Sequence, residues 1–217
     1  PGTWTVWPAA LGKLYATVAA LKSRMGNITT TGSDTEFHSA CFAASRWVEQ
    51  FCSRLFYRSA AATVRTFAPT DHWRVKMPEF NDLVSVSALA TDPGGDGTFE
   101  TAWTASDFQL WPPNPAAAPE AQPYTQIRAI GGQSFTLPAS RWARRDTVQV
   151  TGVFGWPAVP QAVREGTLVK AEEFFKLKDA PFGVAGFEDV GFIRIRENLA
   201  ATSLLGPYRR LPPVLVA

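Results

Sequence analysis

The ten residues Val148-Gln149-Val150-Thr151-Gly152-Val153-Phe154-Gly155-Trp156-Pro157 mark a change of hydrophobic period along this chain. Val148 and Val150 flank Gln149, which is the alternation of a strand with one buried face. After Pro157 the period becomes helical: Pro160 suits the first turn of a helix, and the apolar face that follows consists of Val163, Thr167, Ala171, Phe174 and Phe175. The opposite side carries Arg164, Glu165, Lys170, Glu172, Glu173 and Lys176. The stretch therefore predicts the end of a β region and the start of a helical one.

Two helices are predicted in the first quarter of the chain. Apolar residues recur three or four positions apart at Leu11, Leu14, Val18, Leu21 and Met25, before Gly26-Asn27 ends the series. Ser33, Asp34 and Glu36 then form a capping-box start. The stripe of the second helix consists of Phe37, Cys41, Ala44, Val48, Phe51 and Leu55, widened by Trp47, Cys52 and Phe56. Its polar face consists of His38, Arg46, Glu49, Gln50 and Arg54. So wide a stripe is expected to pack on the first helix.

From about Ala62 to Val153 the hydrophobic pattern repeats every two residues. The apolar positions of the alternating runs are Trp73, Val75 and Met77, then Val84, Val86 and Ala88, then Phe99, Thr101 and Trp103. Residues 92–97 read Asp-Pro-Gly-Gly-Asp-Gly and predict a hairpin turn. Residues 111–123 contain five prolines and predict an extended loop. This part is expected to form a small antiparallel β unit inserted between helices.

The last part of the chain alternates loop, strand and helix. Residues 181–191 predict a loop, and 192–196 an alternating strand with Ile193 and Ile195 packed on one side. Arg194 and Arg196 lie on the other side, where we expect them to face an acidic neighbour or a channel. A short helix over 198–205 precedes an extended tail with an apolar tip. The predicted class is α+β: an α-helical bundle with an inserted antiparallel β unit and a C-terminal tail, divided into 1–61, 62–153, 154–205 and 206–217.

Composition narrows the classes of function. The chain has 217 residues and a net charge of +2, so we do not expect it to grip a nucleic-acid backbone along its length. No apolar run approaches the roughly 20 residues of a membrane span, and the first residues lack the pattern of a secretory signal. Cys41 and Cys52 fall on one predicted helix about 16 Å apart, too far for a disulfide. These features indicate buried thiols and a cytoplasmic protein.

The sequence shows no catalytic, cofactor-binding or metal-binding constellation. His38 lies on a polar helix face, and His72 stands between Asp71 and Trp73 without a nucleophile elbow elsewhere. Asp92, Asp96 and Glu100 superficially suggest a calcium loop, but the ligand spacing of an EF-hand is missing and turn geometry explains the prolines and glycines.

Two alternatives stay open. An unrecognised hydrolase would draw first on Asp71, His72 and Glu79. A DNA-binding accessory protein would use the basic cluster of Arg141, Arg144 and Arg145, which flanks Trp142.

The order of segments resembles the head-to-tail adaptor (connector) proteins of long-tailed bacteriophages over nearly the whole chain. The resemblance rests on Leu11 to Met25, on Ala44 to Phe56, on the turn at 92–98, and on Phe108 to Asn114. Its strongest part is the stretch from Val148 to Pro157 with the helix after Pro160, and Leu205-Gly206-Pro207-Tyr208-Arg209-Arg210 also matches.

The resemblance implies a structural virion protein and no enzyme. Such adaptors form a ring, here expected to be dodecameric, beneath the portal in the neck. The ring extends the DNA channel, seats the stopper or tail-completion protein, touches genomic DNA transiently, and has no cofactor or membrane contact. The protein would reside in the host cytoplasm during assembly. The expected portal-docking residues lie in the tail: Tyr208, Arg209, Arg210, Leu211, Val214 and Leu215. Arg194 and Arg196 are the candidates for contact with a neighbouring subunit or the channel.

Overall fold

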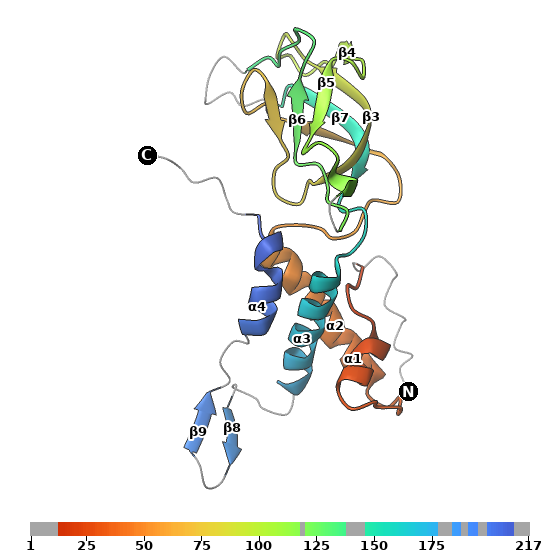
Figure 1. Ribbon diagram of the computed structural model, residues 1–217, viewed down its shortest axis with the longest axis vertical. Coiled ribbons are helices and arrows are strands. Elements are labelled where there is room, and N and C mark those ends of the chain that lie inside the picture. The colour runs from red at the N-terminus through yellow and green to blue at the C-terminus, as the bar shows by residue number, and fades with distance from the viewer. Residues whose placement is uncertain are drawn as a thin grey trace. The chain divides into compact units, whose positions relative to one another are not determined.

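A computed structural model describes residues 13–117, 120–137, 146–177, 184–187, 191–194 and 199–210, with side chains for all of these except 184–187 and 191–194. The chain forms two compact units, one from Pro1–Cys52 with Val159–Ala217 and the other from Ser53–Ala158 (Figure 1). No helix within the described ranges is long and apolar enough for a bilayer crossing. Several residues with predicted roles lie outside the described ranges: Leu11, Arg141, Arg144, Arg145, Ile195, Arg196, Leu211, Val214 and Leu215.

The helical unit is built around α2 (Asp34–Cys52) and α3 (Gln161–Lys176). The shorter α1 (Val18–Arg24) contacts both, and α4 (Leu199–Leu205) packs on α3 (Figure 1). The core is formed by Leu21, Phe37, Cys41, Ala44, Leu168 and Ala171. Phe37 and Phe175 stack with their ring centroids 4.0 Å apart, which joins α2 to α3. The predicted contact of α2 with the first helix is confirmed, but the wide apolar stripe of α2 packs more extensively on α3.

The first helix is shorter than predicted. It begins at Val18, because the Thr17 side chain accepts a hydrogen bond from the Ala20 N–H and Thr17 itself has extended backbone angles. The expected helical turns at 13–17 are therefore wrong. Tyr15 and Ala16 are buried there without being helical. The predicted stop is confirmed, since Gly26 and Asn27 both have positive φ.

Two charged residues of the long helices depart from the predicted helix pattern. The pattern places Glu49 and Lys170 on solvent-facing sides, yet their exposed fractions are 7% and 8%. Glu49 is covered by the segment before α1, and the Lys170 ammonium group lies 4.5 Å from the centroid of the Trp47 ring. The end of α2 also differs from the prediction. Ser53 has φ of 52°, so Arg54, Leu55 and Phe56 lie beyond the helix.

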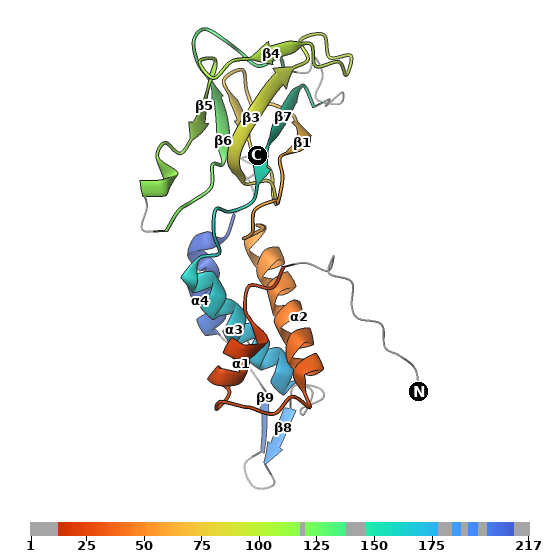
Figure 2. The same cartoon turned by 90° about the vertical axis from the view of Figure 1, so that its right-hand side faces the viewer.

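The second unit is an antiparallel β structure with two sheets. A four-stranded sheet has the order β1-β7-β3-β4, formed by β1 (Thr63–Phe67), β7 (Val148–Phe154), β3 (Leu83–Thr91) and β4 (Thr101–Trp103) (Figure 2). A three-stranded sheet has the order β2-β6-β5, formed by β2 (Arg74–Lys76), β6 (Gln126–Ala129) and β5 (Phe108–Trp111). Both sheets contribute to one core, which includes Val75, Leu89, Ile127, Val148 and Val150. In the described part of 70–150, the helical structure is the three-residue turn η1 (Pro115–Ala117). The predicted α+β class with an antiparallel β unit is confirmed.

Two strands depart from the predicted alternation. The alternation places Trp73 on the same apolar face as Val75 and Met77, but it is 59% exposed because it lies in the tight turn between Asp71 and Arg74, ahead of β2. In β3 the register shifts twice, between Leu83 and Ser85 and between Val86 and Ala88. These β-bulges put Leu83 and Leu89 in the core in place of the predicted Val84 and Ala88.

Residues 148–157 pack closely against two other segments of the β unit, at Ser85 and at Tyr57. Burial alternates strictly along β7, as predicted. A Cβ at Gly152 would lie 2.2 Å from the Ser85 carbonyl oxygen, and one at Gly155 would lie 1.8 Å from that of Tyr57. Both glycines therefore allow close backbone approach, and Gly155 also has φ of +108°. Next to it, the Trp156 indole N–H donates to the buried Asp82 carboxylate at 3.2 Å, which also pairs with Arg54 at 2.8 Å.

Beyond α3 the structure describes a hairpin and α4. Strand β8 (Val184–Phe187) pairs with β9 (Gly191–Arg194) in antiparallel register, with Val184 opposite Arg194 (Figure 2). The predicted strand at 192–196 is confirmed over 192–194. The predicted loop at 181–191 is wrong over 184–187 and at Gly191, because the two strands of the hairpin supply each other's backbone hydrogen-bonding partners. The α4 helix is followed by a short 3-10 turn, η2 (Gly206–Tyr208).

Candidate functional site

The C-terminal segment, the predicted docking element, leaves the helical unit from a fixed base. Leu205 is fully buried at the end of α4, and a Cβ at Gly166 would lie 2.9 Å from its Cγ atom. The Arg210 N–H donates to the Cys52 carbonyl oxygen at 2.9 Å, which ties the segment to the last residue of α2. The Arg209 guanidinium lies 5.3 Å from the centroid of the Phe51 ring. Whatever follows Arg210 therefore starts from a defined position.

The structure describes the predicted docking residues of the tail as far as Arg210. Tyr208 and Arg210 are half-buried and Arg209 is exposed. Leu211, Val214 and Leu215 lie outside the described residues, as do Arg196 and the side chain of Arg194. The structure thus brings Arg209 and Arg210 to the end of α2, a placement that no local sequence pattern indicates.

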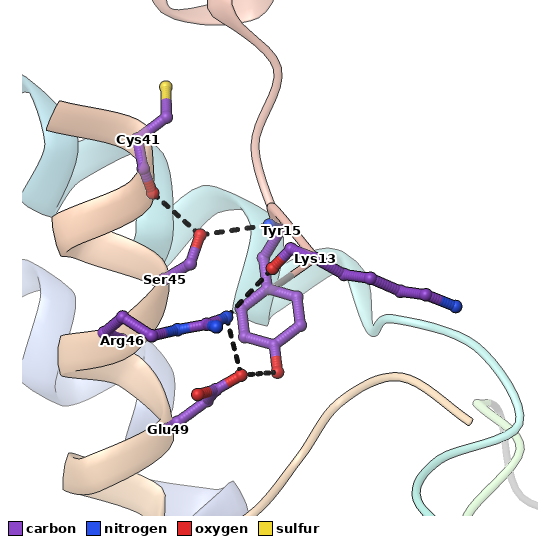
Figure 3. A network of polar contacts seen from close by, with 6 residues as sticks. All are labelled: Lys13, Tyr15, Cys41, Ser45, Arg46 and Glu49. Carbon is purple, nitrogen blue, oxygen red and sulfur yellow. Dashed lines mark hydrogen bonds and ion pairs between the residues drawn. The ribbon is translucent and has the colours of Figure 1, made fainter. Parts of the chain in front are cut away.

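A buried polar network fixes the segment before α1 on α2 (Figure 3). The Tyr15 N–H donates to Ser45 Oγ at 3.1 Å, and the Tyr15 hydroxyl donates to Glu49 Oε1 at 2.6 Å. Arg46 donates to the same Glu49 oxygen at 2.8 Å and to the Lys13 carbonyl at 2.9 Å. Burial raises the pKa of Glu49, although the Tyr15 hydrogen bond and the Arg46 charge act in the opposite direction.

Sequence reasoning missed this network, because it assigns Arg46 and Glu49 to a polar helix face. The signal that could have found it is Tyr15, an aromatic residue with a polar group inside the first predicted apolar series. A tyrosine hydroxyl that is carried into a core requires a partner there. Because these bonds link Lys13 and Tyr15 to Ser45, Arg46 and Glu49, the network holds two chain segments together.

A pocket of about 420 Å³ lies beside this network within the helical unit. Its wall is mainly apolar and includes Leu14, Ala20, Val159 and Leu168. Two charged residues, Arg164 and Glu165, also line it. Its size is that of a small-molecule site. The lining contains neither histidine nor cysteine. The Thr17 side chain in the lining accepts the Ala20 N–H as a helix cap.

The suspected hydrolytic residues have structural partners. Burial would raise the pKa of Asp71, but hydrogen bonds from the Trp73 N–H and the Arg74 guanidinium outweigh it and lower the pKa. His72 Nδ1 lies 3.2 Å from the Phe135 carbonyl oxygen. Within the described residues no hydrogen bond joins His72 to Asp71 or Glu79. His38 is exposed on α2.

Both cysteines are buried free thiols. Burial raises the pKa of Cys41 to about 11, which keeps it protonated and unreactive at neutral pH.

The turn after β3 brings three carboxylates together. Oxygen atoms of Asp92, Asp96 and Glu100 all lie within 4.8 Å of one another. The Asp92 carboxylate is already engaged, because it accepts the N–H groups of Gly95 at 2.6 Å and Gly97 at 2.7 Å. Asp92 therefore braces the turn, as the sequence predicts.

Comparison with solved structures gives a likeness over the whole chain. One match is a chain from the "Neck of empty GTA particle computed with C6 symmetry", with a TM-score of 0.52 and 16% identity over 92% of this chain and 91% of that one. The chain shares its fold with a protein of that neck. Another match comes from the "Virion of native gene transfer agent (GTA) particle", with a TM-score of 0.50 and 16% identity over 100% of this chain and 97% of the other. No protein-family model and no curated protein sequence matches this chain. The resemblance to head-to-tail adaptors thus agrees with the fold.

Proposed function

We propose that this chain is a structural protein of a phage-like virion, located in the neck, where it acts as a head-to-tail adaptor. The observation that supports this most is the fold likeness to a neck chain over 92% of this chain and 91% of the other, because it includes both compact units. The hydrogen-bonded roles of Asp71, His72 and Glu49 are those of structural residues, which favours a protein that works by docking.

The proposed assembly is a ring beneath the portal, with twelve copies, that extends the DNA channel and seats the stopper or tail-completion protein. The neck that contains the similar chain was computed with C6 symmetry, which is compatible with rings of six or twelve subunits. Genomic DNA would pass through the ring with transient contacts. Arg194 and Arg196 remain the candidates for contact with a neighbouring subunit or with the channel.

The proposed portal-docking element is the segment that follows the base at Arg210. Leu211, Val214 and Leu215 would act as apolar anchors, each contributing about 1.5–3 kcal/mol on burial. Pro212 and Pro213 restrict the unbound segment and so reduce the entropy lost on binding. The fixed base adds to this effect, because the segment is attached at Arg210, whose backbone N–H is bonded to the Cys52 carbonyl oxygen.

A chain that ends at Arg210 tests this docking element. It keeps the hydrogen bond from Arg210 to Cys52 and the contact of Arg209 with Phe51, so its melting temperature should match that of the full chain. It should lose co-sedimentation with purified portal particles. A full-length variant with residues 211–217 in shuffled order is the matched control for length and composition, and it should also fail to bind.

Undiminished binding of the truncated chain to portals would show that the docking element lies elsewhere. Cryo-EM of the full chain mixed with portals tests the proposed adaptor function directly. A ring seated on the portal is expected, and failure of the full chain to associate with the portal of its own particle would refute the adaptor function.

A further inference from the structure

The three-stranded sheet of the β unit has one face in the core and one face outside it. Residues directly opposite one another in an antiparallel pair lie on the same face. Val75 is opposite Ile127, which is opposite Leu110, and this row belongs to the core. The two flanking rows therefore lie on the outer face, which consists of Arg74, Arg128 and Gln109 in one row and Lys76, Gln126 and Trp111 in the other.

This outer face carries three positively charged side chains. Arg74 is paired with Asp71 at 2.7 Å. Lys76 is exposed and forms no ion pair within the described residues. The Arg128 guanidinium stacks 3.6 Å from the centroid of the Trp111 ring, while its Nε atom and the Gln126 Oε1 atom are buried without a hydrogen-bond partner in the described part of the chain. The positive charges of Lys76 and Arg128 favour a partner that carries negative charge.

The same unit also presents a complementary surface, the turn after β3. Its three carboxylates lie within 4.8 Å of one another. Asp92 is buried, whereas Asp96 and Glu100 are exposed, and their negative charges attract an approaching cation. Glu100 is exposed and forms no ion pair within the described ranges. The turn connects strands of the four-stranded sheet, whereas the basic face belongs to the other sheet. The two surfaces therefore lie on different layers of the unit.

We propose that the outer face of the β2-β6-β5 sheet binds the Asp92–Glu100 turn of a second copy of this chain. The two surfaces are different patches, so the contact is head-to-tail, and contacts of this type close into rings or continue as filaments. Arginine and tryptophan at the centre of the face are the residue types that dominate binding energy at interfaces. The inference rests on the proposed ring and extends it by naming the surfaces between its subunits, but the contact itself can be measured on the free protein.

The observations favour a second copy over nucleic acid as the occupant. One face of the Trp111 ring is already occupied by the Arg128 guanidinium, which reduces the ring surface available for stacking a base. A carboxylate-bearing turn needs no stacking surface, and its negative charges match the positive charges of the face.

A charge exchange between the two surfaces tests the proposal. The variant Lys76→Glu with Gln109→Glu makes the sheet face acidic, and Thr98→Lys with Glu100→Lys makes the turn basic. None of these four side chains forms a hydrogen bond or ion pair within the described residues, so folding should be unaffected. Each variant alone places like charges opposite one another and should self-associate about tenfold more weakly than the wild type. An equimolar mixture should restore association, because each changed surface then meets its opposite.

Sedimentation velocity at low ionic strength, with chain concentrations up to about 1 mM, measures the association of each sample. Arg58→Glu and Glu79→Lys reverse exposed charges elsewhere on the β unit and should leave association unchanged. The proposal is overturned if the wild type stays monomeric over this range, if either variant associates like the wild type, or if the mixture fails to recover. Loss of duplex DNA affinity in the face variant, with unchanged self-association, would instead assign the face to nucleic acid. Portal co-sedimentation of the same variants reports on the docking segment, so failure of the two proposals is distinguishable.

Discussion

Glu49 is a carboxylic acid that the fold encloses although local sequence places it on a polar helix face. Its surroundings shift its pKa in opposite directions. Burial favours the neutral form, whereas the Tyr15 hydroxyl and the Arg46 charge favour the carboxylate. Burial is the larger influence, and the folded-state pKa lies above the ordinary value. The residue therefore couples the attachment of the segment before α1 to pH.

Replacement of Glu49 by Gln should alter how stability depends on pH. A raised folded-state pKa means that the folded protein binds more protons than the unfolded one between the two pKa values, so wild-type stability falls as pH rises through that window. The glutamine side chain cannot titrate but still accepts the Tyr15 hydrogen bond. The wild type should thus lose stability relative to Glu49→Gln as pH rises from about 4.5 to 7, by about 1.4 kcal/mol for each pH unit separating the two pKa values.

Urea unfolding of both proteins across this pH range measures the difference. Glu79→Gln, at an exposed position of the β unit, should show a flat difference from the wild type. A stability difference for Glu49→Gln that stays flat, or a wild type that gains stability relative to the variant as pH rises, would contradict the assigned direction of the pKa.

At the scale of elements, α4 depends on one glycine of α3. Gly166 is buried, and Leu205 occupies the space next to it. A glycine in a helix interior costs about 1 kcal/mol relative to alanine, so its presence here is explained by the close approach of α4. The same contact positions the base of the C-terminal segment, since Leu205 precedes η2 and the Arg210 hydrogen bond.

Gly166→Leu should overpack this junction and destabilise the helical unit by about 1–3 kcal/mol. Leu205→Ala alone should cost about 2–5 kcal/mol through loss of buried contacts. The double variant should be less destabilised than the sum, because the smaller side chain at 205 makes room for the larger one at 166. Chemical denaturation gives all three values, and Arg164→Leu at an exposed position of α3 is the control. Strict additivity would show that the two positions do not share one space.

At the scale of the whole molecule, the β unit has its own core, and the two chain segments that enter and leave it lie next to each other. Its core residues all lie between Phe67 and Phe154. Its two connecting segments are tied side by side, since Phe56 packs on Trp156 with ring centroids 5.1 Å apart and the Trp156 backbone N–H donates to the Tyr57 carbonyl at 3.4 Å. A unit with its own core and adjacent ends has the properties of an autonomous insert.

A fragment of residues 53–158 should therefore fold without the helices. Heteronuclear NMR should give dispersed amide resonances, and thermal unfolding should be cooperative. The same fragment with Gly155→Ala should fail, because the added Cβ would lie 1.8 Å from the Tyr57 carbonyl oxygen at a φ that alanine rarely adopts. An unfolded wild-type fragment would show that the helical unit is required for the β structure.

The sequence by itself determined where the element types change and which face of each long element is apolar. The strict alternation of β7, the stripe of α2 and the stop at Gly26-Asn27 are local patterns, because side-chain periodicity and positive φ depend on a few neighbouring residues. The order of these elements also carried the resemblance to adaptors.

The tertiary structure decided what covers each face and which distant residues meet. Glu49 is buried because Tyr15, 34 residues earlier, lies over it, and Trp73 is exposed because a tight turn carries it away from the core. The placement of β7 between β1 and β3, the bulges of β3, and the basic face opposite the core row of the second sheet all arise from pairing between remote segments. Local periodicity specifies a surface but not its partner, since the partner depends on contacts that sequence spacing does not encode.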